Sequence, residues 1–369
     1  MAAAAALVRG APVLAAAWAA ASLVGGAGAA EASSMFVDVD ALPKSLSLAD
    51  GFRVSLIRPP GEPANSGTKM LVNFSSMELL EDDEIATLDA YDALFEKYSL
   101  FCNGRWLGAQ VLQDSQDLMY LQHITFMKKP DVIIETGTYK GGLTYFFASM
   151  LDWIDSGKEG PAQIISVDVH NPDLVWAANW FCPVCVDCIR PYTTDVWNRR
   201  VRFVQGHADT EAVYNQMLNH LYDIGIMRFV DQATGEVRNG PDVEVVDGQP
   251  SASVSLAVDP QKTVLVNLDA NHEFDGLLKE LLFYAPLVSE NSYLVVQDTK
   301  LDKIWGTAGP TAALNRFLSI APAGEFVVEH ELKFHAYSQH TYLRRAQVTV
   351  PYTHFLETMI ALTRAQKNS

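Results

Sequence analysis

Basic residues are scarce in this 369-residue chain, which has 27 Lys and Arg against 44 Asp and Glu. A nucleic-acid-binding protein needs a basic face to meet phosphates, so the acidic balance argues against such a partner. The chain also lacks an internal repeat and the G-x-G-x-x-G fingerprint of dinucleotide enzymes. The acidic balance does not exclude an enzyme that acts on small or neutral substrates.

Long apolar runs are absent after the first thirty residues, so no later segment is expected to cross a bilayer. In residues 1–30, Arg9 precedes an apolar stretch over 11–24 and a small-residue site at 27–29. This order predicts a signal peptide cleaved after Ala29, and therefore the secretory pathway or an extracellular location. An uncleaved membrane anchor and an organellar transit peptide are the alternatives for an Ala-rich leader without acids.

Only four cysteines are present, and three of them lie in Cys182-Pro-Val-Cys185-Val-Asp-Cys188. In a secreted chain this spacing favours disulfides, and the even total lets one member pair with Cys102. A zinc site with Cys102 or a His as fourth ligand is the alternative. The cluster belongs to a Cys- and Trp-rich insertion over 171–198, which we expect to form a lid beside the second strand of a sheet or a small satellite core.

Strand and helix patterns alternate through most of the chain, which predicts an α/β fold with a doubly wound, Rossmann-like sheet and helices on both faces. Strands are expected at 131–135, 163–168, 201–205, 263–269 and 293–298, with an antiparallel closing pair at 326–331 and 340–345. Helices are expected at 78–100, within 106–127, and at 142–153, 209–224, 275–284, 310–320 and 353–366. The predicted organisation is a leader at 1–30, an arm and helix at 31–103, the main domain at 104–350 and a tail at 351–369. The polar segment 231–260 fits a surface loop or hairpin.

A glycine turn follows the first of these strands, in Glu135-Thr-Gly137-Thr-Tyr-Lys-Gly141-Gly142. Glycine permits a sharp turn and lets a ligand approach the backbone. The helix that follows directs free N–H groups toward the same space. Many α/β proteins have such a turn without a cofactor, so this turn alone leaves a nucleotide-like cofactor and a bare turn equally open.

Acidic residues or histidine end four of the strands, and ligands of such a sheet bind at the carboxyl ends of its strands. The residues in question are Asp168, the run 206–209, Asp269-Ala-Asn-His272-Glu273 and Gln297-Asp298. Asp168 is placed to accept hydrogen bonds from ribose hydroxyls. Two carboxylates such as Asp269 and Asp298 repel each other unless a cation or proton lies between them, which favours a hard ion such as Mg²⁺. The alternative is that each Asp caps the helix that follows it.

Several runs resemble one family in the right order. They are 106–122, Pro130–Gly142, Leu268–His272, Glu280–Val288, Tyr293–Thr299 and Gly309–Leu318. Over about 104–345 they look like the cephalosporin hydroxylase/rhamnosyl O-methyltransferase family. This resemblance implies the fold of S-adenosylmethionine-dependent methyltransferases.

The resemblance also implies roles for the site residues. The cofactor would be held by Glu135, Gly137, Thr138, Gly141 and Gly142 at its methionine end, by Asp168 at its ribose, and by His207 and Asp209 near its adenine. A divalent metal would be bound by Asp269, Asp298 and the neutral ligand Gln297. His272 would be the catalytic base, acting beside Asp269. The Cys-rich insertion departs from the family pattern.

The function that we expect is therefore a metal-assisted O-methyltransferase acting on a hydroxyl of a sugar or another small polyol. Its partners would be a small-molecule or glycan acceptor and S-adenosylmethionine, and a homo-oligomer is left open. An oxidoreductase, as the older family name suggests, and a non-catalytic glycan-binding protein are the alternatives.

Overall fold

A computed structural model describes part of the chain, and the chain divides into two compact units, Met1–Leu80 and Glu81–Ser369. The described residues are 36–38, 55–57, 69–73, 82–154, 162–177, 181–231, 237–238, 245–246, 249–250, 254–329 and 341–348. The predicted leader and the C-terminal helix at 353–366 lie outside them. Among the described helices, none combines the length and the apolar character that a membrane span requires.

The first unit contributes a three-stranded antiparallel sheet from the segment that the sequence predicted to be an irregular arm. Its strands are β1 (Phe36–Asp38), β2 (Ser55–Ile57) and β3 (Lys69–Asn73), in the order β1-β3-β2. Residues 53–58 alternate in sequence like a strand, and β2 lies within them. Short strands such as β1 carry too few residues for an alternating pattern to be recognised.

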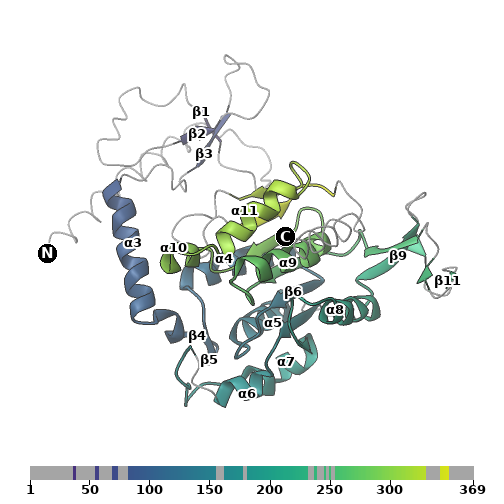
Figure 1. Cartoon of the computed structure of the whole chain (residues 1–369), viewed down its shortest axis with the longest axis horizontal. Helices are drawn as coiled ribbons and strands as arrows, with labels where there is room; N and C mark the ends of the chain where they lie inside the picture. Colours follow the sequence, from purple (N-terminus) through teal and green to yellow (C-terminus); the bar gives the residue numbers. More distant parts are fainter. Residues whose placement is uncertain are drawn as a thin grey trace, which may run out of the picture. The chain divides into compact units, whose positions relative to one another are not determined.

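Seven strands form the main sheet of the second unit (Figure 1). They are β6 (Val132–Thr136), β7 (Gln163–Asp168), β8 (Val201–Gln205), β14 (Val264–Leu268), β15 (Tyr293–Val296), β16 (Phe326–Val328) and β17 (Tyr342–Arg345). Their order is β16-β17-β15-β14-β6-β7-β8. The strands from β15 to β8 pair in parallel. Strand β17 pairs antiparallel with β15 and β16, so the predicted doubly wound sheet with its closing pair is confirmed.

Apolar side chains cover both faces of this sheet because successive residues of a strand point to opposite sides. In β6, Val132 and Ile134 join one core, and Ile133 joins the other. The first core is covered by α8 (Glu211–Asp223), α9 (Phe274–Tyr284) and α11 (Pro310–Ile320). The second is covered by α4 (Ser115–Lys128), α5 (Gly142–Ile154) and α7 (Asp195–Arg200). The continuous apolar strands are therefore buried between two helical layers.

The remaining elements are short, apart from α3 (Asp82–Lys97). The hairpin of β4 (Gly104–Trp106) and β5 (Ala109–Val111) precedes α4 and was not predicted from the sequence. The segment predicted as a loop or hairpin contains the antiparallel sheet β10-β9-β13. The other elements are η3 (Leu100–Asn103), α6 (Pro172–Ala177), η4 (Pro191–Thr193), β9 (Met227–Asp231), β10 (Val237–Arg238), β11 (Val245–Val246), β12 (Gln249–Pro250), β13 (Val254–Val258), η6 (Ala285–Leu287) and α10 (Leu301–Trp305).

Helix α3 belongs to the same compact unit as the sheet, although the sequence grouped it with the arm. Phe95 of α3 is buried and forms a small core with Leu301 of α10 and with Phe101. Lys300 donates to Asp92 over 2.9 Å, and Lys303 forms a second ion pair with Asp89. Apolar contact and paired charges together hold α3 against the start of α10.

All four cysteines form disulfides, as the sequence favoured. Cys102 pairs with Cys182 across a sequence separation of 80 residues, and Cys185 pairs with Cys188 across 3. The longer link joins η3 to the insertion. A disulfide lowers the entropy of the unfolded chain more when it closes a longer loop, so the two bonds should contribute unequally to stability.

We predict that the double variant Cys102→Ala/Cys182→Ala unfolds at a much lower denaturant concentration than Cys185→Ala/Cys188→Ala. The chain-entropy difference between the two loops amounts to about 3 kcal/mol. Urea unfolding of both variants and of the unmodified chain, followed by circular dichroism, measures the difference. Equal losses of stability in the two variants would contradict the prediction.

Candidate active site

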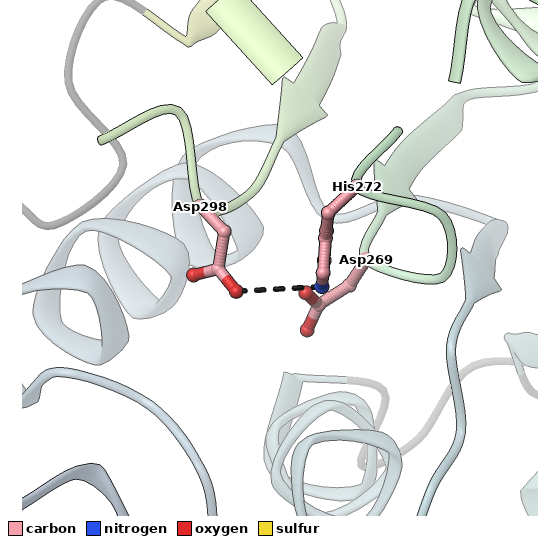
Figure 2. Close-up of side chains that lie close together, drawn as sticks. All are labelled: Asp269, His272 and Asp298. Atoms are coloured by element: carbon pink, nitrogen blue, oxygen red, sulfur yellow. Dashed lines mark ion pairs between the residues drawn. The ribbon is translucent and has the colours of Figure 1, made fainter. Parts of the chain in front are cut away.

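Three side chains that could hold a metal ion meet at the carboxyl edge of the sheet, as Figure 2 shows. Asp269, His272 and Asp298 each offer one ligand atom, and these atoms all lie within 4.8 Å of one another. His272 Nε2 lies 3.5 Å from Asp298 Oδ2. All three side chains are partly exposed, so a ligand can reach them.

The pairing of two neighbouring parallel strands brings these residues together. Leu268 of β14 lies opposite Val296 of β15, and the Gln297 N–H donates to the Leu268 carbonyl over 2.9 Å. Asp269 directly follows Leu268, and Asp298 follows Gln297. Parallel strands end at the same edge of a sheet, so the two carboxylates are brought to one edge.

The two carboxylates perturb each other electrostatically. Removal from water raises the pKa of Asp269 well above its usual range, and the charge of Asp298 raises it further. Removal from water also raises the pKa of Asp298, and His272 opposes that rise. Asp298 has a φ of +59°, a conformation that costs energy for most residues and that Asp tolerates better than most. The edge therefore concentrates negative charge on a strained turn, as sites that bind cations commonly do.

Two glutamines flank this group in different ways. Gln113 is buried after β5, and its Nε2 donates to Asp269 Oδ2 over 2.9 Å. Gln297, which the sequence predicted as a neutral metal ligand, is also buried, and its Nε2 donates to Asn267 Oδ1 over 2.8 Å. The observed hydrogen bond of Gln297 therefore joins two strands, and a role as metal ligand stays a prediction.

The glycine turn after β6 lies directly beside Asp269. A methyl group on Gly137 would come within 2.0 Å of the Asp269 carbonyl oxygen. Likewise, a methyl group on Gly142 would meet the Gln110 carbonyl oxygen at 2.0 Å, and one on Gly141 would meet the Trp197 ring at 2.8 Å. The sequence attributed these glycines to the approach of a ligand, but contacts with the protein itself already require them.

Asp168 supports this turn from the end of β7. Its Oδ2 accepts from the Tyr139 N–H over 2.7 Å, and its Oδ1 accepts from the His170 N–H over 2.8 Å. Tyr139 has a φ of +47°, so the carboxylate fixes an uncommon backbone conformation. Both carboxylate oxygens of Asp168 therefore already accept backbone hydrogen bonds. Binding of ribose hydroxyls by Asp168 stays a prediction.

Glu135 lies completely buried beneath the turn. Its Oε2 accepts hydrogen bonds from Thr144 and from Ser166, and Ser166 also contacts the Thr138 hydroxyl at 2.5 Å. Burial raises the pKa of Glu135 to about 7, against the lowering effect of these hydrogen bonds. Its Oε1 is buried and has no partner in the described part of the chain.

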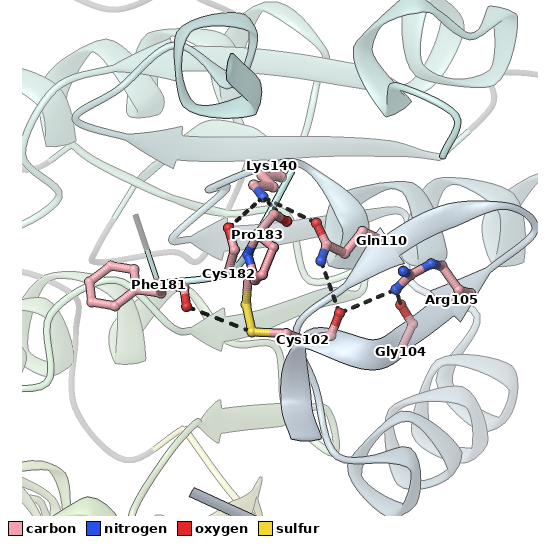
Figure 3. The surroundings of a disulfide bond; sticks show 8 residues. All are labelled: Cys102, Gly104, Arg105, Gln110, Lys140, Phe181, Cys182 and Pro183. Carbon is pink, nitrogen blue, oxygen red and sulfur yellow. Dashed lines mark hydrogen bonds between the residues drawn. A yellow bond between two sulfur atoms is a disulfide. The ribbon is translucent and has the colours of Figure 1, made fainter. Parts of the chain in front are cut away.

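Lys140 connects the turn to the insertion, as Figure 3 shows. Its buried ammonium group donates to Gln110 Oε1 and to the carbonyl oxygens of Cys182 and Pro183, over 3.1 to 3.2 Å. The Cys102–Cys182 disulfide fixes the same segment, and the ring of Phe181 lies 6.1 Å from that of Tyr139. The insertion therefore packs against the glycine turn after β6, whereas the sequence predicted either a lid beside the second strand or a small satellite core.

The predicted adenine-side residues lie at the end of β8. His207 is exposed, and Asp209 is partly exposed with a carboxylate oxygen 3.7 Å from Lys279 Nζ. The described structure does not group them with Asp269, His272 and Asp298. Their contact with a cofactor stays a prediction.

Sequence reasoning missed Gln113 and Glu280 as parts of the site. Glu280 of α9 is buried, its Oε2 accepts from the Thr136 hydroxyl over 2.7 Å, and burial raises its pKa to about 8. Thr136 also accepts the Asp269 N–H through its carbonyl over 3.0 Å. The carboxylate of Glu280 within the apolar run Glu280–Val288 was the sequence signal that could have identified it. Glu is rarely fully buried unless it has a partner, so a Glu in an apolar segment indicates a specific interaction.

Comparison with known proteins now identifies the family. The sequence model described as rhamnosyl O-methyltransferase/CmcI matches residues 97–184 and 242–346, just over half of the chain. The chain belongs to this family. It is an S-adenosylmethionine-dependent O-methyltransferase of the rhamnosyl O-methyltransferase/CmcI type, as the resemblance implied.

One relative in this family is the rhamnosyl O-methyltransferase of Mycobacterium leprae (strain TN). It is 22% identical over 218 residues, which cover 57% of this chain and 70% of the relative. Among solved structures, a CmcI structure described with Mg and SAM is 13% identical and covers 67% of this chain and 78% of its own, with a TM-score of 0.39. An O-methyltransferase from Bacillus cereus in complex with SAH is 12% identical over 69% of this chain and 85% of its own, with a TM-score of 0.34. Structural similarity at this level is too distant to assign roles to individual residues.

We predict that Glu280→Gln makes the stability of this family member less dependent on pH. The folded pKa of about 8 lies above the ordinary value of 4.5, so the protonated carboxyl stabilises the fold fully below pH 4.5. That contribution is lost as the pH rises toward 8, whereas glutamine keeps an acceptor oxygen and stays uncharged. Between pH 5 and 8 the unfolding free energy of the unmodified chain should fall by about 3 kcal/mol more than that of the variant.

Urea unfolding at several pH values measures this difference. Glu211→Gln, which removes an exposed carboxyl from α8, is the matched control and should follow the unmodified chain. Parallel pH profiles for Glu280→Gln and the unmodified chain would show that Glu280 is charged in the folded state.

Proposed function

We propose that this methyltransferase transfers the methyl group to a hydroxyl of a sugar or a similar polyol, with help from a divalent cation. The observation that carries the proposal is the group of Asp269, His272 and Asp298 beside the glycine turn. The description of the family and that of the Mycobacterium leprae relative both name a rhamnosyl acceptor, which supports a sugar.

The donor set of this group fits a hard divalent cation. Two carboxylates repel each other at this separation, and a cation between them removes the repulsion. Mg²⁺ commonly binds through one or two carboxylates and keeps other positions for water and substrate, so Asp269 and Asp298 would suffice to hold it. The cation would supply positive charge that lowers the pKa of an acceptor hydroxyl. Gln113 would keep the Asp269 carboxylate in place through its hydrogen bond.

His272 would act as the base that takes the proton from the acceptor hydroxyl. Imidazole ionises near neutral pH, so it can accept a proton and release it again under ordinary conditions. Its Nε2 also lies close enough to the carboxylates to bind the cation as a third ligand. One nitrogen cannot do both at once, so the metal content of a His272 variant distinguishes these roles.

The cofactor would bind above the glycine turn, with its methionine end near Glu135. S-adenosylmethionine supplies a methyl group already activated on a sulfonium ion. The buried Glu135 Oε1 has no partner among the described residues, and an ammonium group is the kind of ligand that it lacks. Turn residues Gly137 to Gly142, with Asp168, His207 and Asp209, would hold the rest of the cofactor. The chain's contribution is to place an oxygen nucleophile in line with the methyl group.

We also propose that the protein works in an oxidising compartment. Both disulfides in the described structure would be unstable in a reducing cytosol, and one of them fixes the insertion against the glycine turn. The need for an oxidising compartment supports the prediction that residues 1–30 are a signal peptide. The acceptor would then be a glycan or small glycoside of the secretory route or the cell exterior.

Binding and transfer can be tested separately with the full-length chain. Calorimetric titration with S-adenosylmethionine should give a binding isotherm, and incubation with glycosides and Mg²⁺ should add the mass of one methylene group to an acceptor. Added chelator should abolish transfer. Folded protein that binds no S-adenosylmethionine would favour a non-catalytic glycan-binding protein, and an oxidised acceptor would favour an oxidoreductase.

We predict that Asp269→Asn and His272→Ala each abolish methyl transfer and leave S-adenosylmethionine affinity largely unchanged. Asp275→Asn, at an exposed position in the first turn of α9, is the charge-matched control and should keep full activity. Elemental analysis after gel filtration should show metal lost from Asp269→Asn and retained in His272→Ala. Loss of metal from both would make His272 a ligand, and full activity in either variant would remove that residue from the mechanism.

A further inference from the structure

The second unit contains a cavity of about 560 Å³, and its lining includes close sequence neighbours of candidate site residues. One wall is the face of α3 that carries Thr87, Leu88, Tyr91 and Asp92, and these positions share a face because they are about one helical turn apart. The opposite wall includes Asp114, Ser115, Gln116 and Met119 from the start of α4, and Lys300 completes the lining. The volume lies within the range of small-molecule sites, which runs from about 300 to 1,000 Å³.

The lining continues directly from the proposed reaction centre. Asp114 follows Gln113, whose Nε2 donates to Asp269 Oδ2 over 2.9 Å. Lys300 comes two residues after Asp298, so their Cα atoms are at most about 8 Å apart. The cavity is therefore lined by close sequence neighbours of Gln113 and of Asp298, so its lining and the candidate site share two chain segments.

Charge in the cavity disfavours an anionic occupant. Asp92 and Asp114 contribute two carboxylates, against one ammonium group from Lys300. That ammonium group already donates to Asp92 over 2.9 Å, with both side chains largely buried. A phosphate or carboxylate on the ligand would meet net negative charge, whereas neutral hydroxyl groups can donate to the carboxylates and to Gln116.

The mouth of the cavity offers apolar surface to a ring. Tyr91 is 51% exposed and Met119 is 63% exposed, although both belong to the lining. Flat aromatic rings supply a large contact area at little entropic cost, and the C–H face of a sugar ring matches such a surface. The lining combines this exposed apolar surface with the partly buried polar side chains of Asp92, Asp114 and Gln116, and a hydroxylated ring requires both kinds of contact.

The α3 wall of the cavity lies outside the segments matched to the family. Its pocket-facing residues, 87–92, precede the segments matched to the family, which begin at residue 97. Phe95 and the ion pairs of Asp89 and Asp92 fix the helix against α10, so the wall is held in place. A rigid wall supplied from outside the matched domain can select the acceptor while the chemistry at Asp269 stays the same.

We propose that this cavity is the acceptor subsite and that it takes an uncharged, hydroxyl-rich ring such as a glycosyl residue. The assignment rests on the proposed function for the identity of the reaction. It adds the residues that select the substrate, with Tyr91 and Met119 packing against the ring. Acceptors with a phosphate or a carboxylate bind more weakly because of the carboxylates of the cavity.

The test measures binding of two aryl glycosides that differ in charge to the full-length chain. The probes are 4-nitrophenyl α-L-rhamnopyranoside and 4-nitrophenyl β-D-glucuronide, titrated by NMR in the presence of S-adenosylhomocysteine, which cannot donate a methyl group. The rhamnoside should bind, and the glucuronide should bind at least about ten-fold more weakly. Tyr91→Ala and Met119→Ala should each weaken the rhamnoside about ten-fold because they remove contact area.

Matched controls come from the same region. Tyr98→Ala alters a tyrosine just beyond α3, and Met127→Ala alters a methionine of α4; both are 61% exposed and lie outside the cavity lining. Both should bind like the unmodified chain. The subsite assignment is overturned if neither glycoside binds, if the glucuronide binds as well, or if the control and cavity variants behave alike. Rhamnoside binding that depends on Tyr91 without methyl transfer from S-adenosylmethionine would leave the subsite in place and refute the proposed function.

Discussion

The contact between Gly137 and the backbone of Asp269 is the constraint on which the candidate site depends. A single added methyl group would lie 2.0 Å from the Asp269 carbonyl oxygen, so the turn after β6 and the end of β14 can lie together only with glycine here. The parallel pairing of these strands places Thr136 opposite Leu268 and delivers both turns to one edge. In the proposed function, the methyl donor above one turn and the acceptor hydroxyl at the other would be neighbours because these two turns are in contact.

The same edge collects more negative charge than a protein interior tolerates easily. Glu135, Asp269, Glu280 and Asp298 all have pKa values raised by removal from water. The repulsion between these carboxylates is reduced by protonation, by hydrogen bonds from buried hydroxyl groups or by a positively charged ligand. A divalent cation and the sulfonium of the cofactor both carry such charge. Ligand binding should therefore stabilise the fold more than the contact area alone suggests.

Much of the fold could be predicted from the sequence because the local patterns were strong. The run Val132–Ile134 was predicted to be a buried strand, and Asp269, His272 and Asp298, which follow two of the strands, do lie together. Gln113 and Glu280 were missed as site residues because one polar residue in an apolar segment has no periodic signal. The contacts of the glycines with the protein itself were not predicted, for a different reason. What fills the space beside Gly137 depends on β14, and sequence spacing does not reveal which strand becomes its neighbour.

The Cys102–Cys182 disulfide determines what happens to the chain after proteolytic cleavage. It closes a covalent ring that contains β4, β5, α4, β6, α5, β7 and α6. The ring therefore includes the glycine turn, strand β6 before it and strand β7, which ends at Asp168. One proteolytic nick anywhere inside this ring leaves the two fragments joined. A nicked molecule would therefore migrate as a single species until a reducing agent is added, and neither fragment could dissociate before then.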